Sequence, residues 1–245
     1  MALFHSPVIG IQNLECVVDA ENPKGLIDLI SQSTITVYGN TSTTTYGGAT
    51  AWNFSGDSPP NSSSKSFRIN EVPNSGAAGS PSGQAPWACE VWVYPTAVTN
   101  QNIIHLSSNN ASTGWCLPCI QMSNGNRFAG HLWQNGPQYV YSEVKTANQW
   151  YNVHVTWDAT NAFRIFVNGE LEGTNTGFTL QTSSGYYGGT GNNYMWIGGP
   201  IQAGCSGNQG RNFTGGIAYF AFRYKVMTET EIKNNFQALR GRFGV

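Results

Sequence analysis

The stretch Trp150-Tyr-Asn-Val-His-Val-Thr-Trp-Asp-Ala-Thr-Asn-Ala-Phe-Arg-Ile-Phe-Val-Asn-Gly169 decides the fold class. Val153, Val155 and Trp157 alternate with polar residues, and a second alternation leads into Asn168-Gly169. A period of two is typical of a β-strand that buries one face. Asn-Gly supplies the two positive φ angles of a type I′ turn, so the chain is expected to return on itself directly afterwards. The stretch therefore predicts antiparallel hairpins.

Short apolar stretches recur along the chain, and residues that favour turns separate them. They lie at 14–20, 52–54, 87–94, 102–106, 115–122, 127–134, 139–144, 194–198 and 213–223. The last is apolar on both faces, which indicates a central strand covered on both sides. Residues 31–50 are predicted as an edge strand and a loop, and residues 22–30 as a turn or short helical stretch. About a dozen short strands are typical of an all-β, two-sheet antiparallel jelly-roll sandwich.

One short helix is predicted at the C-terminus. Thr228 and Glu231 have the spacing of a capping box, in which each side chain accepts from the other's backbone N–H. Ile232 and Phe236 then fall on one helical face, and Gly241 is expected to end the helix. No repeat of fixed period appears. We predict a single domain over residues 14–245, preceded by an N-terminal arm of residues 1–13 that could dock on another protein.

The composition limits which classes of partner the protein is expected to bind. Of the 245 residues only 10% are charged, the net charge is −1, and aromatic residues make up 13%. A polar, weakly charged surface rich in aromatic residues suits sugar binding or packing against other proteins. It does not suit nucleic acid, which requires clustered Lys and Arg to replace phosphate counterions. No signal peptide and no apolar stretch of membrane-spanning length is visible, so no membrane association is expected.

Neither disulfides nor cofactors are expected. The five cysteines are an odd number, and the Cys116–Cys119 pair lacks the βαβ context of a redox motif, so free thiols are predicted. The candidate ligands for a calcium ion are Asp57 and Asp158. Calcium usually takes several carboxylate oxygens, and neither residue has an acidic neighbour. A solvated or turn-forming Asp is the alternative for both.

Four segments resemble a known family. They are Trp87-Ala-Cys-Glu-Val-Trp-Val-Tyr-Pro-Thr96, the stretch from Trp150 to Gly169, Met195-Trp-Ile-Gly-Gly199 and Phe213-Thr-Gly-Gly-Ile-Ala-Tyr-Phe-Ala-Phe-Arg-Tyr-Lys225. Their order and spacing resemble laminin-G-like/concanavalin-A-like lectin and glucanase domains. The resemblance implies a lectin-like sandwich over roughly residues 87–240. Many members of that family bind calcium at a loop rim, but no calcium residues of the family match positions here.

The two ends of the chain resemble proteins of tailed bacteriophages, notably those of cyanobacteria. The segments are His5-Ser-Pro with Leu14-Glu-Cys-Val-Val-Asp-Ala-Glu-Asn-Pro-Lys24, and Asn235-Phe-Gln-Ala-Leu-Arg-Gly-Arg-Phe-Gly244. This resemblance implies a virion structural protein. The sequence departs from the phage pattern after Lys24.

Sugar binding would require exposed aromatic rings beside planar polar groups. One strand places Arg127, His131 and Trp133 on one face, and the next strand places Tyr139 and Tyr141 together. A second candidate pair lies in a Gly-rich loop, Tyr186 and Tyr187. The alternative for these rings is a place in the core or in a protein interface.

No catalytic residues are assigned. Glycanases of this fold require two acids across a cleft, and only Glu170 and Glu172 share a face here, beside a hairpin tip where they are expected to be solvated. His105 and His154 lie in predicted strands and are expected to be satisfied sheet residues rather than ligands.

Three functions therefore remain. The first is a non-enzymatic virion structural protein that decorates a capsid, collar or tail and contacts other virion proteins, with homo-oligomerisation open. The second is a carbohydrate-binding adhesin for a host surface glycan. The third is a glycan-degrading enzyme, which the missing acid pair disfavours. The expected location is the virion, after synthesis in the host cytoplasm.

Overall fold

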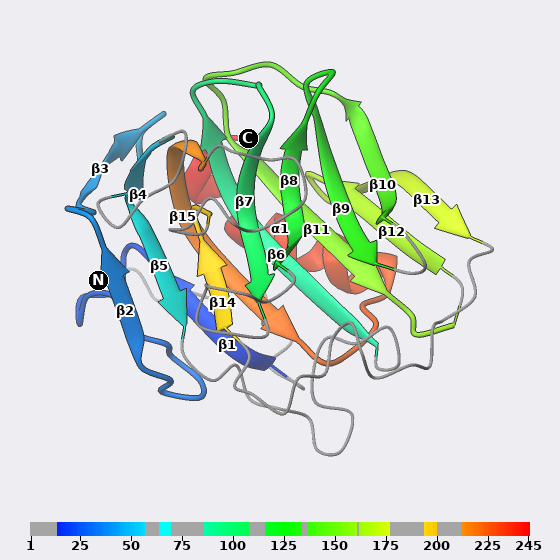
Figure 1. The fold of residues 1–245 in the computed structure, drawn as a ribbon, viewed down its shortest axis with the longest axis horizontal. Helices are drawn as coiled ribbons and strands as arrows, with labels where there is room; N and C mark the ends of the chain where they lie inside the picture. The colour runs from blue at the N-terminus through cyan, green and yellow to red at the C-terminus, as the bar shows by residue number, and fades with distance from the viewer. Residues whose placement is uncertain are drawn as a thin grey trace.

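A computed structural model describes residues 14–56, 64–69, 86–107, 116–133, 137–160, 162–176, 194–199 and 212–245. Within them the chain forms two antiparallel sheets that face each other, with one helix outside (Figure 1). The predicted all-β sandwich is thus confirmed. The predicted arm of residues 1–13 lies outside the described residues, and the division into an arm and one domain stays a prediction.

Eight strands form sheet A, in the order β13-β12-β11-β6-β15-β4-β3, with β1 also paired to β15. Their bounds are β1 Leu14–Asp19, β3 Thr43–Tyr46, β4 Ala49–Ser55, β6 Trp87–Pro95, β11 Tyr151–Trp157, β12 Ala162–Val167, β13 Glu170–Thr176 and β15 Thr214–Arg223. The doubly apolar segment is β15, which pairs with β1, β4 and β6 and is buried on both faces, as predicted.

Seven strands form sheet B, in the order β10-β9-β8-β7-β14-β5-β2. Their bounds are β2 Ile35–Tyr38, β5 Ser66–Ile69, β7 Gln101–Ser107, β8 Cys116–Ser123, β9 Arg127–Trp133, β10 Pro137–Val144 and β14 Tyr194–Ile197. Residues 31–50 provide two edge strands rather than the one predicted: β2 lies at the edge of sheet B and β3 at the edge of sheet A. This segment therefore passes from one sheet to the other.

The predicted hairpin is present. β11 pairs with β12 and β12 with β13, and Asn168 and Gly169 between the last two have φ angles of 52° and 81°. The side-chain oxygen of Asn168 also accepts a hydrogen bond from the backbone N–H of Asn152, at 2.9 Å, which ties the turn to β11. The local sequence thus fixes this corner of sheet A.

The core lies between the sheets, where alternate side chains of both meet. Its largest members are aromatic: Trp52, Phe54, Phe67, Trp87, Phe128, Trp157, Phe163, Phe213, Phe220 and Phe222. Cys16, Cys89 and Cys119 are buried free thiols, and burial raises the pKa of each, so they behave as small apolar groups. The side chains of Cys116 and Cys205 lie outside the described residues.

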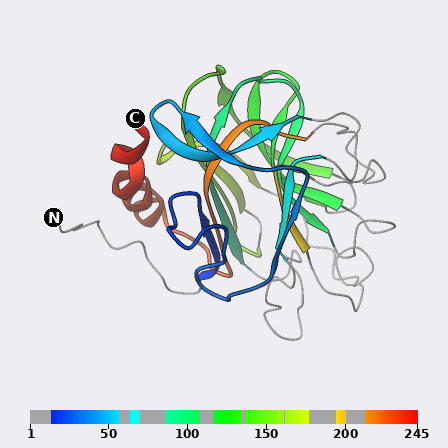
Figure 2. The same cartoon turned by 90° about the vertical axis from the view of Figure 1, so that its left-hand side faces the viewer.

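Helix α1, Glu229–Phe243, packs on the outer face of sheet A (Figure 2). The predicted capping box forms between Thr228 and Glu231. The predicted end at Gly241 is wrong, because the helix continues to Phe243 and Gly244 is the left-handed C-cap. Phe243 stacks on Trp92 with ring centroids 4.0 Å apart, and this buried contact outweighs the cost of one glycine inside a helix.

Residues 22–30 form turns rather than a helix. Asp28 is the reason, because its buried carboxylate accepts hydrogen bonds from the backbone N–H groups of Val17 and Ile30. No helix in the described part of the chain is long and apolar enough to cross a membrane.

Candidate binding face

The outer face of sheet B is the side turned away from sheet A. Phe128 and Ile120 point into the core, so the alternate residues of β9 and β8 point outward. Met195 and Ile197 likewise point inward and leave Trp196 outside. The outward side chains gather most of the aromatic and polar groups of this sheet.

One row of outward residues runs across the strands. Tyr139 on β10 lies opposite His131 on β9, and His105 on β7 lies opposite Trp196 on β14. Trp196 in turn lies opposite Arg68 on β5. Because neighbouring strands are about 4.8 Å apart, the row from β10 to β5 spans roughly 24 Å.

A second row lies beside the first. Tyr141 is opposite Ala129, Ala129 is opposite Gln121, and Gln121 is opposite Asn102. Asn212 continues the row through a β-bridge to Asn102. Ala129, between Tyr141 and Gln121, is fully buried.

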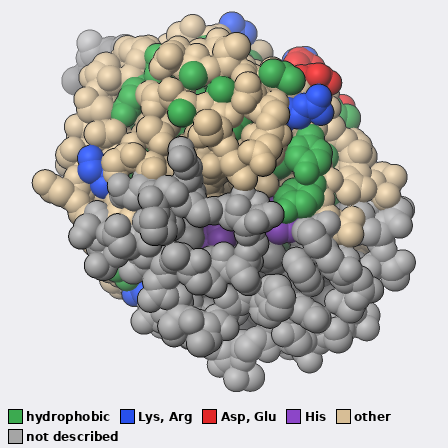
Figure 3. Space-filling model, turned by 45° about the horizontal axis from the view of Figure 1, so that its top comes forward, with side chains coloured by type: hydrophobic (Ala, Val, Ile, Leu, Met, Phe, Trp, Pro, Cys, Tyr) green, Lys and Arg blue, Asp and Glu red, His purple; other side chains and the backbone are tan. Residues whose placement is uncertain are grey.

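Aromatic rings stack at the β10 end of the face. The rings of His131 and Tyr139 are 4.5 Å apart and nearly parallel, at 16°, and Tyr139 and Tyr141 are 5.6 Å apart at 19°. Tyr141 is 42% exposed. Figure 3 shows histidine and hydrophobic side chains gathered together on this side of the molecule. These three rings, His131, Tyr139 and Tyr141, form a platform that we call the aromatic platform.

A different aromatic group lies at the other end of the rows. The guanidinium carbon of Arg68 is 4.7 Å from the ring centre of Tyr194, 5.5 Å from that of Trp196 and 5.7 Å from that of Tyr38. Such distances are those of cation–π contacts. Trp196 is fully buried, whereas Tyr38, Arg68 and Tyr194 around it are partly exposed.

Polar atoms without partners lie in the aromatic platform and between the two ends. Among the described residues, no hydrogen-bond partner is found for either ring nitrogen of His105 and His131, for the carbonyl oxygen of Gln121, or for the amide of Asn212. All four side chains are at most 5% exposed. An unsatisfied buried polar group costs about 1–3 kcal/mol. The outer face of sheet A also holds such groups, among them Trp92, Asn152 and Thr156.

Both imidazoles on this face are neutral at physiological pH. Burial lowers the pKa of His105 to about 3, with a smaller contribution from His131, and burial lowers the pKa of His131 to about 4. A neutral imidazole carries one donor and one acceptor nitrogen. Burial also raises the pKa of Tyr139 and of Tyr141, so the platform tyrosines keep their hydroxyl protons.

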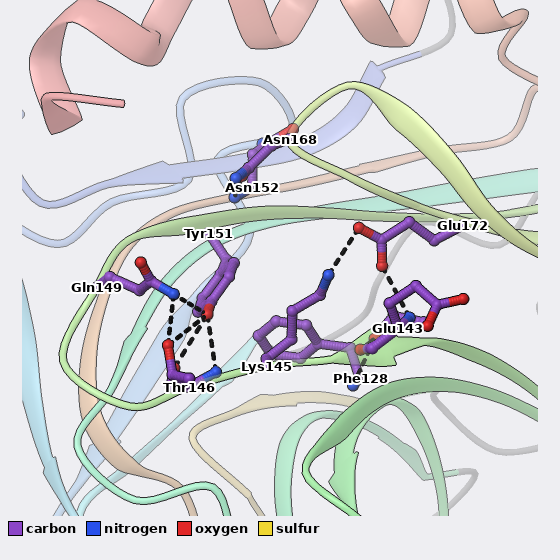
Figure 4. Close-up of polar contacts among 10 residues, drawn as sticks. Phe128, Glu143, Lys145, Thr146, Gln149, Tyr151, Asn152, Asn168 and Glu172 are labelled. Carbon is purple, nitrogen blue, oxygen red and sulfur yellow. Dashed lines mark hydrogen bonds and ion pairs between the residues drawn. The ribbon is translucent and has the colours of Figure 1, made fainter.

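Polar contacts hold the end of β10 in place (Figure 4). The carboxylate of Glu172 on β13 accepts from the backbone N–H of Glu143, at 2.9 Å, and pairs with Lys145 at 2.7 Å. The hydroxyl of Tyr151 accepts from the backbone N–H of Thr146, at 3.0 Å. These contacts tie the edge strand of sheet B to sheet A, so the platform rests on a fixed strand.

Comparison with known proteins identifies the family. Residues 74–233, more than half of the chain, match the family profile described as the concanavalin A-like lectin/glucanases superfamily. The chain belongs to this superfamily. No curated protein is similar enough in sequence to be matched.

Solved structures share the fold at low sequence identity. One is the binding domain of botulinum neurotoxin DC in complex with SialylT, with a TM-score of 0.62 and 14% identity over 93% of this chain and 51% of that one. Another is botulinum neurotoxin type C, whose cell entry depends on interaction with two ganglioside molecules. Its TM-score is 0.63, with 14% identity over 93% of this chain and 51% of that one. A third is the binding domain of Paraclostridial Mosquitocidal Protein 1, with a TM-score of 0.61 and 12% identity over 91% of this chain and 52% of that one. The chain spans about half the length of these domains.

The structure brings together part of the predicted sugar site. His131, Tyr139 and Tyr141 meet in the aromatic platform, and Arg127 is exposed on the same strand as His131. The backbone of Trp133 pairs with Pro137, but its side chain lies outside the described residues, as do Tyr186 and Tyr187 entirely.

Sequence reasoning missed the central part of the face. His105 was expected to be a satisfied sheet residue, which is wrong, because neither of its ring nitrogens has a partner within the described residues. Gln121 and Trp196 were not singled out. No local signal could have placed Trp196 beside His105, since the pairing of β7 with β14 joins segments about ninety residues apart and depends on the sheet order.

The predicted metal and acid candidates are accounted for separately. Asp158 forms a turn, and its Oδ1 accepts from the backbone N–H groups of Thr160 and Ala162. Asp57 lies outside the described residues, within which no group of three or more His, Cys, Asp and Glu could hold a metal. Glu170 and Glu172, expected to be solvated, pair with separate lysines, Lys233 and Lys145, each at 2.7 Å.

Proposed function

We propose that the protein is a non-enzymatic binding module for a saccharide, which lies on the outer face of sheet B. The observation that carries the proposal is the juxtaposition of stacked, partly exposed rings with buried polar atoms that lack partners in the described structure. The rings match the apolar faces of a sugar, and the polar atoms match its hydroxyl groups.

A pyranose ring has apolar C–H faces and a rim of hydroxyl groups. The faces pack on aromatic rings, and the hydroxyls donate to and accept from planar polar side chains. Tyr141 offers an accessible ring, while the neutral imidazole of His131 offers both a donor and an acceptor directly beside Tyr139. The platform thus provides stacking and hydrogen bonding within one pair of strands.

The relatives support the proposal without deciding it. The superfamily includes lectins, and the type C neurotoxin interacts with gangliosides, which carry glycans. A non-enzymatic role is supported by three acids of sheet A: Glu90 is buried under α1, and Glu170 and Glu172 bind different lysines. Neither arrangement offers the paired, accessible carboxylates of glycan hydrolysis.

The test is a glycan array probed with the labelled protein, followed by titration calorimetry on the glycans that bind. Tyr141→Ala is expected to weaken binding at least tenfold, because it removes the exposed ring. Leu171→Ala is the matched control, since Leu171 is 43% exposed and lies on sheet A. Retention of glycan binding by Tyr141→Ala and Tyr139→Ala would refute this face as the site.

We also propose that the module is carried on the virion of a tailed bacteriophage, in contact with capsid, collar or tail proteins. The two segments that resemble phage proteins support this, because they lie together in the fold. Arg242 of the C-terminal segment pairs with Asp19 at 2.9 Å and with Glu21 at 3.2 Å, both in the N-terminal one. Two segments far apart in the sequence thus form one structural unit.

Immunogold electron microscopy of purified particles tests the location. Label on heads would indicate a decoration protein, and label on collars or tails would indicate host adhesion, for which the aromatic platform becomes the expected contact. Particles without label would overturn the virion proposal and leave a free saccharide-binding module.

A further inference from the structure

We infer that two copies of the chain associate edge to edge through β2, which pairs antiparallel with β2 of the second copy and joins the two B sheets into one. The surface involved is the side of the sandwich formed by residues 27–48, which carries β2 and β3; we call it the uncharged edge. β10 and β13 lie at the opposite ends of the two sheets, so the dimer does not depend on the proposed saccharide site.

The two sides of the sandwich differ in how their edge strands are covered. On one side β13 covers β10 within the same chain. The side-chain amide of Asn175 donates to the carbonyl oxygen of Tyr139, at 2.9 Å, and the carboxylate of Glu172 accepts from the backbone N–H of Glu143. These contacts use backbone groups of β10 that a further strand would need, so this side is closed.

The other side leaves an edge strand open. Within the part of the chain that the structure describes, β2 pairs with β5 alone and no strand lies on its far side. Such an edge is a template for pairing with a second strand. β2 and β3 lie at the left of Figure 1, and Figure 2 looks directly onto that side.

Charge distinguishes the two sides as well. Proteins commonly protect an edge strand from self-association with charged side chains. The β10–β13 side carries four of them, Glu143, Lys145, Glu170 and Glu172. Residues 29–56 contain no Asp, Glu, Lys or Arg, although 10% of the chain is charged. A charged partner would therefore find no counter-charge on β2 or β3, whereas a second uncharged edge is complementary, and a net charge of −1 per chain causes little repulsion.

Apolar side chains gather at the same edge. Of the seven large hydrophobic residues that are exposed among the described residues, four lie here, Ile27, Leu29, Ile30 and Val37. Val37 lies opposite Phe67 of the core and so points to the inner face of sheet B, yet 47% of it is exposed. A strand added beside β2 would bury it.

The size of the uncharged edge suits a dimer. Of its twenty-two residues, only Asp28 is buried. Each side of a stable interface contributes about 20–30 residues. This one segment of chain thus offers the number of accessible positions that a stable contact needs.

The alternation of β2 fixes the register of the pair. Ile35 and Val37 share the inner face, and residues of one face must lie opposite each other in a continuous sheet. A two-fold axis at Thr36 places Ile35 opposite Val37 of the second copy, an apolar pair. An axis at Val37 would instead place Ile35 opposite Gly39 of the second copy, which has no side chain and a left-handed φ of 60°. The axis is therefore assigned to Thr36.

The dimer would carry its two aromatic platforms far apart. β10 and β2 are the two ends of sheet B, so the platforms lie at opposite ends of the joined sheet, about 60 Å apart at the usual strand spacing. Two linked sites bind a surface more tightly than one site does. This consequence rests on the proposed function, whereas the dimer itself does not.

Sedimentation equilibrium of the whole protein over a concentration series tests the association. The wild type is expected to reach twice the monomer mass of 26.6 kDa. Val37→Lys places a charge on the edge strand and is expected to weaken association at least tenfold. Leu171→Lys is the matched control, because Leu171 is 43% exposed on the edge strand β13, and it is expected to dimerise like the wild type. Thermal unfolding checks that both variants are folded.

Cross-linking tests the register independently. With Thr36→Cys and oxidised glutathione, the two symmetry-related thiols are expected to form a disulfide between copies, while their two electrons and two protons pass to glutathione. Thr174→Cys, at an exposed position of β13, and the wild type are the controls and are expected to remain unlinked on a denaturing gel.

Three outcomes would overturn the inference. The first is a wild-type protein that stays monomeric at every concentration. The second is a dimer that Val37→Lys leaves intact, or that Leu171→Lys disrupts in its place. The third is a dimer in which Thr36→Cys forms no more cross-link than Thr174→Cys. A glycan array without binding would refute the proposed function and leave the dimer untouched.

Discussion

The outer face of sheet A lies beneath α1 and carries Glu90, His154 and Arg223, whereas the outer face of sheet B carries His105 and His131 beneath no helix that the structure describes. Both faces bury imidazole groups. On sheet A the buried polar groups converge on one another. On sheet B they do not.

The Glu90 carboxylate is the centre of the sheet A network. It accepts from the side-chain amides of Asn152 and Asn235, at 3.1 and 3.3 Å. His154 lies 3.3 Å and Arg223 3.7 Å from its two oxygens. Burial alone would raise the pKa of Glu90, but His154, Arg223 and Asn152 outweigh it and lower the pKa to about 2.

The comparison teaches that similar residues serve different ends according to what covers them. Asn235 comes from α1, so the helix completes the network and the face becomes part of the fold. Both faces keep buried polar atoms that lack a hydrogen-bond partner among the described residues. Sheet B differs in its stacked rings, of which Tyr141 is exposed, and this is why we assign binding to that face. Four experiments test this contrast, from the largest expected effect to the smallest.

Glu90→Gln should cause the largest loss of stability. It leaves the Arg223 charge buried without a counter-charge, which typically costs about 3–5 kcal/mol. Urea unfolding measures the change. Glu229→Gln, an exposed substitution in the first turn of the same helix, should cost only a few tenths of a kcal/mol. Equal effects of the two substitutions would contradict the network.

Phe243→Ala should destabilise the protein by about 3 kcal/mol, because the ring is buried and stacks on Trp92. The same urea titration measures it. If α1 closes only the outer face of sheet A, glycan binding on sheet B should be unchanged under native conditions. A loss of binding without unfolding would show that the two faces are coupled.

Acidification from pH 7 to pH 5 should destabilise the protein through the sheet B histidines. Their folded-state pKa values are depressed, so protons bind the unfolded chain first, and stability present above pH 6.5 is lost as the pH falls towards 3. His105 alone accounts for about 2 kcal/mol over this interval. His105→Phe should therefore show a shallower decline in a pH series of thermal unfolding. Glu90 contributes only below about pH 4.5, its usual value. Parallel wild-type and variant curves would exclude a depressed His105 pKa.

Thr228→Ala should have the smallest effect, about 1 kcal/mol, since it removes one side of the capping box that begins α1. Thermal unfolding detects a loss of this size. Thr228→Ser keeps the acceptor oxygen and serves as the control, so a matching loss in both variants would contradict the capping interpretation.

The sequence predicted the strands and the helix better than it predicted which of them pack together. The Asn168-Gly169 turn and the Thr228 cap were predicted correctly, because each depends on residues within one turn of chain. The end of α1 was not, because Phe243 acts through its contact with Trp92 on a distant strand. For residues 22–30 the sequence left a turn and a short helix open, and the contact of Asp28 with β1 goes with the turn. Tyr139 and Tyr141 were found because alternation alone places them on one face.

The sequence by itself determined that the chain is a two-sheet β-sandwich with a capped helix, because periodicity and turn chemistry are local properties. Only the tertiary structure decided that His105 faces Trp196, that Asn212 meets Asn102, and that α1 covers Glu90 rather than His131. These outcomes depend on the order of strands in each sheet and on which outer face the helix covers. Burial and register, which turn identical residue types into a network or a binding face, exist only once the sheets are assembled.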